Sequence, residues 1–192
     1  MIGRMGNPDA PRPLVVGPAV LAWGTRTWLM GILNVTPDSF SGDGLLAAPD
    51  PIEAGVAQAR RMVADGADLL DVGGASSRPG HTVIDPDEEA ARVVPVIRAI
   101  HEALPATPLS VDTTSPAVAR LGPVVHQDDR HAPLGRDPEH GRVVGDAPDV
   151  VEQAGAGVDI VRVHDVRENL RAARTADAIL RGWRPEAWEG GA

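Results

Sequence analysis

The sequence predicts an α/β fold in which the strands of a parallel sheet alternate with helices. Four apolar runs of strand length recur along the 192-residue chain, and a segment of helical character follows each of them. Polar residues gather where these strands end, which is where parallel α/β folds place their ligand-binding loops. We therefore expect βα units around a barrel-like sheet, in a single domain that spans residues 1–192.

Residues 1–27 are expected to form an N-terminal extension and a hairpin ahead of the main fold. After a Pro-rich start, segments 14–20 and 21–27 have the composition of two short strands around a Gly-Pro turn. The Pro-rich start lacks the apolar middle of a secretory signal.

Residues 28–121 are predicted to hold the first βα units. The segment WLMGILNV, residues 28–35, is apolar almost throughout, as in a strand that is buried on both faces. Residues 51–65 place apolar side chains at helical spacing after a Pro in the first turn. A second buried strand follows at 67–74, and the acidic start of residues 86–104 is typical of the next helix.

The same pattern then repeats. A third strand is expected at 108–114, and a helix begins after it with Ser115 as its cap and Pro116 at its first position. Residues 151–192 are expected to form the last βα unit and a tail, with the fourth strand at 158–165 and a closing helix after it.

Residues 122–150 interrupt this pattern. They contain repeated Pro and Gly turn signals and show no period of 2 or 3.6, so an irregular connector is expected there. A structureless segment of that length is rare inside a compact domain. Without a regular framework to orient side chains, a solvated loop is a better interpretation than a metal site for its candidate ligands, which are His126, Asp128, Asp129, His131 and His140.

Composition excludes several classes of function. The chain has no Cys, and all 18 basic residues are Arg, so thiolate chemistry and lysine Schiff bases are impossible within it. A net charge of −9 without a basic stripe argues against nucleic-acid binding. No apolar run reaches the roughly 18 residues that a membrane span needs, so we expect a soluble, cytoplasmic protein.

Polar side chains fall at the carboxyl ends of three predicted strands. Asn34 ends the first strand, where barrel enzymes place ligand-binding groups, although it could instead satisfy a neighbouring backbone group. Residues 71–80, DVGGASSRPG, suit an anion through glycines, hydroxyls and Arg78, but they equally suit an ordinary turn. Asp112 ends the third strand and suits a donor-rich heterocycle, or else it is an N-cap or turn residue before Ser115 and Pro116.

The fourth strand ends in VRVHD, where alternation places Arg162 and His164 on one face. An Arg within an apolar strand needs a partner if it is buried, and a solvated pair is the alternative. Because the carboxyl ends of parallel strands meet at one edge, the four strand ends are expected to form one site, suited to a polar heterocycle and an anion.

Four segments occur in the order MGILNVTPDSFSGDG, DVGGASSRPG, LSVDTTSPAVA and IVRVHDVRE, and together they resemble the signature segments of dihydropteroate synthase. The resemblance covers roughly residues 28–121 and 153–180, and the first two motifs are long enough to be highly specific. Cobalamin-dependent methyltransferases that bind methyltetrahydrofolate share the pterin-binding barrel, but the TPDSF and SSRPG loops favour the synthase.

The resemblance implies a TIM (β/α) barrel of the pterin-binding type and a transferase of folate biosynthesis that is assisted by Mg²⁺. Such an enzyme condenses 6-hydroxymethyl-7,8-dihydropterin pyrophosphate with 4-aminobenzoate to 7,8-dihydropteroate and pyrophosphate. Its partners would be these small molecules, without nucleic acid or membrane, and a homodimer is left open.

The resemblance also implies roles for individual residues. Asn34 would help to bind Mg²⁺ and the pyrophosphate, and Asp112 would contact the pterin. Arg162 and His164 would grip the leaving pyrophosphate as catalytic residues. The remaining assignments are to two loops: a mobile first loop with Asp38 and Phe40, and a second loop that builds the aminobenzoate pocket with Ser77, Arg78 and Pro79.

The chain departs from the family between the third and fourth predicted strands. There the family has about four further strands, which carry an Asn-Asp pair, an Asp in a Gly-rich loop and a Ser-Arg-Lys; residues 122–150 take their place here. An incomplete barrel of about four of the eight βα units is therefore expected. Three hypotheses follow: a dihydropteroate synthase, a catalytically impaired pterin- or pyrophosphate-binding pseudoenzyme or truncated remnant, or a half-barrel completed by a second chain.

Overall fold

The computed structural model describes residues 13–16, 18–36, 44–74, 84–120, 143–144 and 158–184. Its main feature is a five-stranded parallel sheet with the strand order β5-β4-β3-β7-β6. A short antiparallel hairpin precedes the sheet in the chain. The hairpin strands are β1 (Leu14–Val16) and β2 (Ala19–Leu21), and the sheet strands are β3 (Trp28–Asn34), β4 (Leu69–Gly73), β5 (Leu109–Asp112), β6 (Val143–Val144) and β7 (Ile160–Val163).

Helices follow the strands of the sheet. Three of them are long: α1 (Pro51–Ala64) comes after β3, α2 (Pro86–Ala103) after β4, and α5 (Val166–Leu180) after β7. Two short helices are η1 (Leu45–Ala47) and α3 (Pro116–Ala119). Across the described segments, no helix combines the length and the apolar content that crossing a bilayer requires.

The predicted α/β fold is confirmed, with strands and helices close to the expected bounds. Two details were wrong. The second hairpin strand is Ala19–Leu21, and a turn and a bend follow at residues 23–26, where Gly24 adopts a φ of 73° that favours glycine. The connector at 122–150 contributes β6, which pairs in parallel with β7 and is too short to show a period in the sequence.

Acidic caps begin α1 and α2 just after the loops that leave β3 and β4. Asp50 accepts hydrogen bonds from the backbone N–H groups of Ile52 and Glu53, both at 3.0 Å. Asp85 accepts one from the backbone N–H of Asp87 at 2.8 Å. A proline follows each cap at the start of the helix, where its missing N–H costs nothing. These caps fix where the chain turns back from the C-terminal edge of the sheet.

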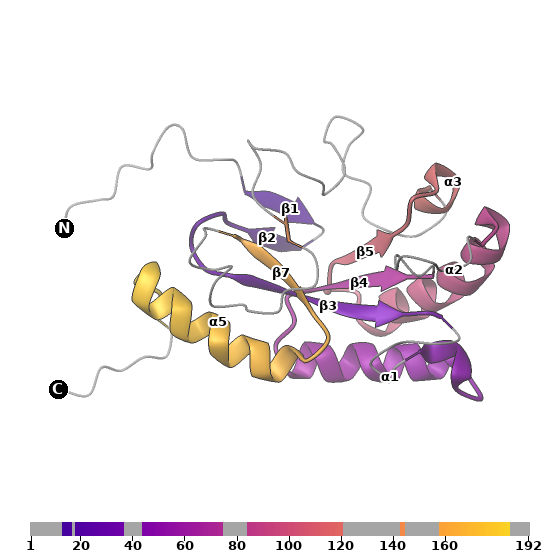
Figure 1. Cartoon of the computed structure of the whole chain (residues 1–192), viewed down its shortest axis with the longest axis horizontal. Coiled ribbons are helices and arrows are strands. Elements are labelled where there is room, and N and C mark those ends of the chain that lie inside the picture. Colours follow the sequence, from indigo (N-terminus) through magenta and orange to yellow (C-terminus); the bar gives the residue numbers. More distant parts are fainter. Residues whose placement is uncertain are drawn as a thin grey trace.

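The two faces of the sheet differ in what covers them. One face packs against α1, α2 and α5 in the larger apolar core, to which the sheet contributes Leu29, Leu33, Leu70, Val72, Val161 and Val163, among others. The opposite face, here called the inner face, packs at its N-terminal end against the hairpin through Leu21, Met30, Leu69 and Ile160. Figure 1 shows the hairpin and α1 on opposite sides of the sheet. Polar side chains follow further along the inner face.

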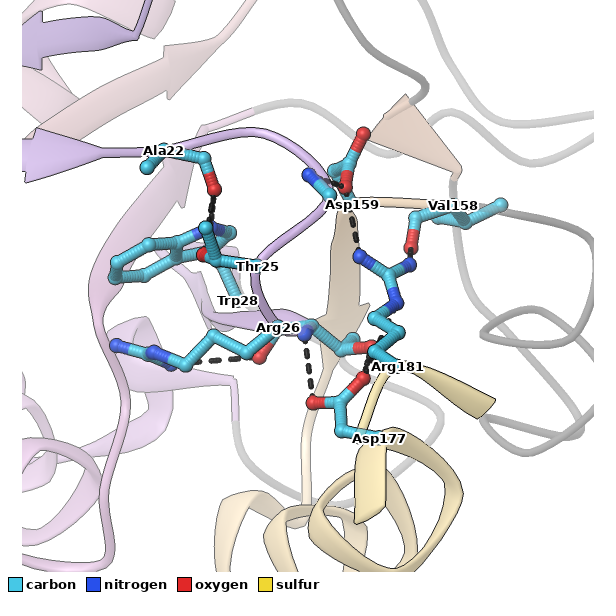
Figure 2. Close-up of polar contacts among 10 residues, drawn as sticks. Ala22, Thr25, Arg26, Trp28, Val158, Asp159, Asp177 and Arg181 are labelled. Atoms are coloured by element: carbon cyan, nitrogen blue, oxygen red, sulfur yellow. Dashed lines mark hydrogen bonds and ion pairs between the residues drawn. The ribbon is translucent and has the colours of Figure 1, made fainter. Parts of the chain in front are cut away.

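A buried polar group, here called the terminal cluster, ties α5 to the start of β3 (Figure 2). Asp177 is fully buried and accepts hydrogen bonds from the backbone N–H of Thr27 at 2.7 Å and from its hydroxyl at 2.9 Å. Arg181 pairs with Asp177 at 3.3 Å and with Asp159 at 2.9 Å. Asp159 also accepts a hydrogen bond from the backbone N–H of Gly24 at 2.8 Å. The terminal cluster therefore joins both ends of the described chain.

We expect the protein to self-associate through the edges of the sheet. Within the described residues, β5 and β6 each pair with only one neighbouring strand, so one edge of each strand is left without a strand partner. We expect sedimentation velocity on the purified protein to detect dimers or larger species at micromolar concentration. A monodisperse monomer that melts in one cooperative transition would contradict this expectation.

Candidate active site

Three inward-facing positions form one row across the C-terminal ends of β3, β4 and β5. Asn34 lies opposite Gly73 in register, and Gly73 lies opposite Asp112. Alternation along the strands places all three on the inner face, beyond the part that the hairpin covers. Because Gly73 has no side chain, it leaves space beside Asp112; a Cβ at this position would lie 3.5 Å from the Asp112 Cβ.

Arg162 of β7 reaches across the inner face to this row. Its Nη2 lies 3.0 Å from Oδ2 of Asp112 and 2.5 Å from Oδ2 of Asp71. Strands β3 and β4 separate β7 from β5, so one side chain connects strands that are not neighbours. The inner face thus holds a guanidinium group between two carboxylates.

Asp71 is the buried member of this group. Its side chain is 7% exposed, whereas that of Asp112 is 45% exposed. The Ser110 hydroxyl donates a hydrogen bond to Oδ1 of Asp71, and Arg162 contacts Oδ2, so both carboxylate oxygens are engaged. Burial raises the pKa of Asp71 above its ordinary value of 3.8, and Asp112 adds to the rise, while Arg162 and Ser110 act in the opposite direction.

The structure brings Asp112 and Arg162 together, as the strand-end geometry predicted. Asp112 is therefore a partner of the kind that Arg162 needs if it is buried. His164 comes directly after β7 and is half-buried, and alternation places it on the same face as Arg162. The cap alternative for Asp112 does not apply, because Ser115 caps α3 and accepts a hydrogen bond from within that helix at 3.4 Å.

Other candidate residues lie outside the described part of the chain. These are the loop residues Asp38, Phe40, Ser77, Arg78 and Pro79, and the connector residues His126, Asp128, Asp129, His131 and His140. The described chain enters the two loops after Thr36 and after Gly74, which follow β3 and β4 directly. Both loops therefore begin beside the row at the C-terminal edge of the sheet.

Sequence reasoning gave Asp71 no role of its own and missed Ser110. A signal for Asp71 was nevertheless present, because it lies between Leu70 and Val72 in a strand that is otherwise apolar. A carboxylate buried in this way needs a cation, and Arg162 on another apolar strand needs an anion. Matching these two requirements predicts the pair. Nothing in the sequence distinguishes Ser110 from other serines near strand ends.

A family model described as "Pterin binding enzyme" matches residues 30–128, just over half of the chain. The chain belongs to this family. The matched range begins within β3 and includes β4 and β5, so it contains all three residues of the row. It also contains Asp71 and Ser110, but not Arg162.

Several curated relatives of this pterin-binding family member are dihydropteroate synthases. The relative from Synechocystis sp. is 44% identical over 110 residues, which are 57% of this chain and 37% of the relative. The relative from Bacillus subtilis is 45% identical over 111 residues, which are 58% of this chain and 38% of the relative. The chain therefore spans less than two fifths of the length of these relatives.

Solved dihydropteroate synthase structures share the fold. The Clostridium difficile enzyme, solved in the presence of pteroic acid, aligns with a TM-score of 0.66 and 28% identity over 83% of this chain and 98% of that one. The Xanthomonas albilineans enzyme, solved with 4-aminobenzoic acid, aligns with a TM-score of 0.65 and 25% identity over 87% and 98%. Each alignment covers a larger share of this chain than residues 1–128 make up. The likeness therefore extends beyond residue 128 into the C-terminal part of this chain. The predicted TIM-barrel class is confirmed, and the described sheet forms part of such a barrel.

The donor chemistry of the row fits a magnesium ion that arrives with a phosphate group. Among the described residues, no group of three or more His, Asp or Glu side chains could hold a metal ion by itself. Magnesium usually keeps several waters and takes one or two protein oxygens together with substrate phosphates. Asp71 and Asp112 are paired with Arg162, whereas Asn34 offers an amide oxygen at the end of β3.

Proposed function

We propose that this chain catalyses the reaction of its relatives, the condensation of 6-hydroxymethyl-7,8-dihydropterin pyrophosphate with 4-aminobenzoate. The main support is the ion pair between Arg162 and Asp112, which belongs to the same row as Asn34. A guanidinium group suits a pyrophosphate, and a half-exposed carboxylate suits the N–H donors of a pterin ring. Both groups lie at the C-terminal edge of a parallel sheet, where barrel enzymes bind their substrates.

The proposed reaction places opposite charges on the two halves of the pterin substrate. The bond between the pterin methylene carbon and the pyrophosphate oxygen breaks, and the aminobenzoate nitrogen bonds to that carbon and then loses a proton. Arg162 and His164 would bind the departing pyrophosphate and stabilise the negative charge that develops on it. Asp112 would orient the pterin ring by accepting hydrogen bonds from it.

The proposal also assigns roles to a magnesium ion and to residues of the two loops. A magnesium ion would neutralise part of the pyrophosphate charge, with Asn34 as its protein contact. Ser77, Arg78 and Pro79 would line the aminobenzoate pocket, and Asp38 and Phe40 would belong to the first loop. We further propose a cytoplasmic location; whether the protein is a homodimer is decided by the sedimentation experiment above.

The proposal is tested by turnover of the purified protein with both substrates, beside calorimetric titration of each substrate and of inorganic pyrophosphate. We expect formation of 7,8-dihydropteroate that depends on both substrates and on magnesium. A matched control is Arg171→Ala, which removes an arginine from an exposed pair with Glu168 and should leave turnover unchanged. Pyrophosphate binding without turnover would overturn the synthase assignment in favour of a non-catalytic binding protein.

Enlarging the side chain at Gly73 is expected to block pterin binding. A Cβ at this position would already lie 3.8 Å from Oδ2 of Asp112, so the further methyl groups of Gly73→Val would fill the space beside that carboxylate. Valine favours strands, so β4 should persist. We expect affinity for the pterin substrate to fall at least about tenfold, measured by calorimetry with circular dichroism as the folding control. Gly73→Ala adds a Cβ at ordinary contact distance and should bind nearly as well as the unmodified protein; equal loss in both variants would contradict the expectation.

A further inference from the structure

Arg162 has two acidic partners that differ in what a ligand can reach. Asp71 and Asp112 both approach the same guanidinium nitrogen, Nη2. Asp112 is 45% exposed, so an incoming group can compete with it, whereas Asp71 is buried and has both oxygens engaged. A ligand at the row would therefore contact Asp112 and Arg162 but not Asp71.

We propose that Asp71, oriented by Ser110, is a positioning residue that holds the Arg162 guanidinium ready for an anion. The inference rests on the proposed function, because the anion in question is the pyrophosphate group. When this group binds, Arg162 exchanges Asp112 for phosphate oxygens while it keeps Asp71. Asp112 is then released to accept hydrogen bonds from the pterin ring. Asp71 thus acts only through Arg162, and Ser110 acts only through Asp71.

Two features of the geometry support this division of roles. Arg162 starts from β7, with β3 between it and β4, so its long side chain would have many rotamers without an anchor on the far strand. Asp71 provides that anchor from β4, and Ser110 of β5 fixes the carboxylate from the other side. The three groups come from three different strands, so the rigid sheet itself sets the position of the guanidinium.

The raised pKa of Asp71 links the stability of the fold to pH. Its raised pKa means that the folded protein binds a proton at Asp71 more tightly than the unfolded chain does. The stabilisation from this proton is complete below the unfolded pKa of 3.8 and is lost as the pH rises through the folded pKa. Ionisation of Asp71 therefore lowers the stability of the folded protein relative to its protonated form.

The test compares Asp71→Asn and Ser110→Ala with the unmodified protein. Asparagine keeps the shape of the side chain but loses the charge, and Arg162 retains Asp112 as a partner. We expect Asp71→Asn to weaken calorimetric binding of inorganic pyrophosphate at least about tenfold, and Ser110→Ala to weaken it less.

The melting temperature of Asp71→Asn at pH 7 should equal or exceed that of the unmodified protein. Its advantage should shrink as the pH is lowered toward 4, because protonation neutralises Asp71 in the unmodified protein.

Asp65→Asn is the matched control, because Asp65 pairs with the exposed Arg167 on the outside of the protein and should not affect pyrophosphate binding. Unchanged pyrophosphate affinity in Asp71→Asn would overturn the positioning role. A lower melting temperature at pH 7 together with unchanged pyrophosphate affinity would identify Asp71 as a purely structural carboxylate. If the unmodified protein binds pyrophosphate without turnover and Asp71→Asn loses this binding, the proposed function fails and the positioning role stands. If the unmodified protein does not bind pyrophosphate, both proposals fail.

Discussion

Replacing Arg162 with alanine is expected to reduce synthase turnover by about two to three orders of magnitude, as when an enzyme loses one main donor to a developing anion. The same variant should lose most of its affinity for inorganic pyrophosphate. The reason is electrostatic: without Arg162, the ligand's phosphates would approach Asp71 and Asp112 without the guanidinium group that lies between the two carboxylates. Steady-state kinetics with both substrates, together with pyrophosphate calorimetry, measures the two effects.

Arg162→Lys separates charge from geometry at this position. Lysine keeps the positive charge but has a single ammonium group in place of the planar fork, so it should bind Asp71 and a phosphate together less well. We expect turnover between that of the unmodified protein and that of Arg162→Ala, while Arg171→Ala remains unaffected. Turnover of Arg162→Ala within about twofold of the unmodified protein would refute the assigned role.

Replacing Asp177 with alanine is expected to cause the largest loss of stability, about 3–5 kcal/mol, as when one partner of a buried ion pair is removed. Asp177 has no exposed surface and satisfies the backbone N–H and hydroxyl of Thr27 as well as Arg181. Alanine would leave these buried donors without their acceptor. Urea unfolding followed by circular dichroism measures the change in the free energy of unfolding.

A suitable control for the stability measurement is Glu168→Ala, on the same helix. Glu168 pairs with Arg171, and both side chains are about 70% exposed, so this substitution should change the free energy of unfolding by less than about 1 kcal/mol. Equal effects of the two substitutions would show that the terminal cluster does not support the fold. Asp177→Asn should fall between them, because an amide oxygen replaces only one of the two acceptors.

The strand framework of the site could be predicted from the sequence because its strands are buried on both faces. WLMGILNV is apolar at nearly every position, and the polar Asn34 at its end is conspicuous for that reason. Arg162 was predictable in the same way, as a lone charge among valines. The geometric rule that parallel strands end at one edge then placed Asp112 near them, and their ion pair bears out that placement.

The features that sequence reasoning missed depend on contacts between distant segments or on very short elements. Ser110 matters because β5 pairs with β4 in a register that sets it opposite Asp71, and no local pattern encodes this register. The β6 strand has two residues, fewer than any periodicity needs. The terminal cluster likewise depends on the fold, because Thr27 and Asp177 look like ordinary surface residues in the sequence.

The pairing of β3 with β7 also determines when the anion site can form during protein synthesis. Strands β3, β4 and β5 and their helices leave the ribosome first, and the hydrogen bond that joins Thr27 to Asp177 spans 150 sequence positions. Contacts of such long range form late in folding. The nascent chain therefore contains Asp71 and Asp112 before Arg162, whose guanidinium group contacts both carboxylates in the folded protein. The ion pairs of Arg162 with both carboxylates can therefore form only after the C-terminal part of the chain has been made.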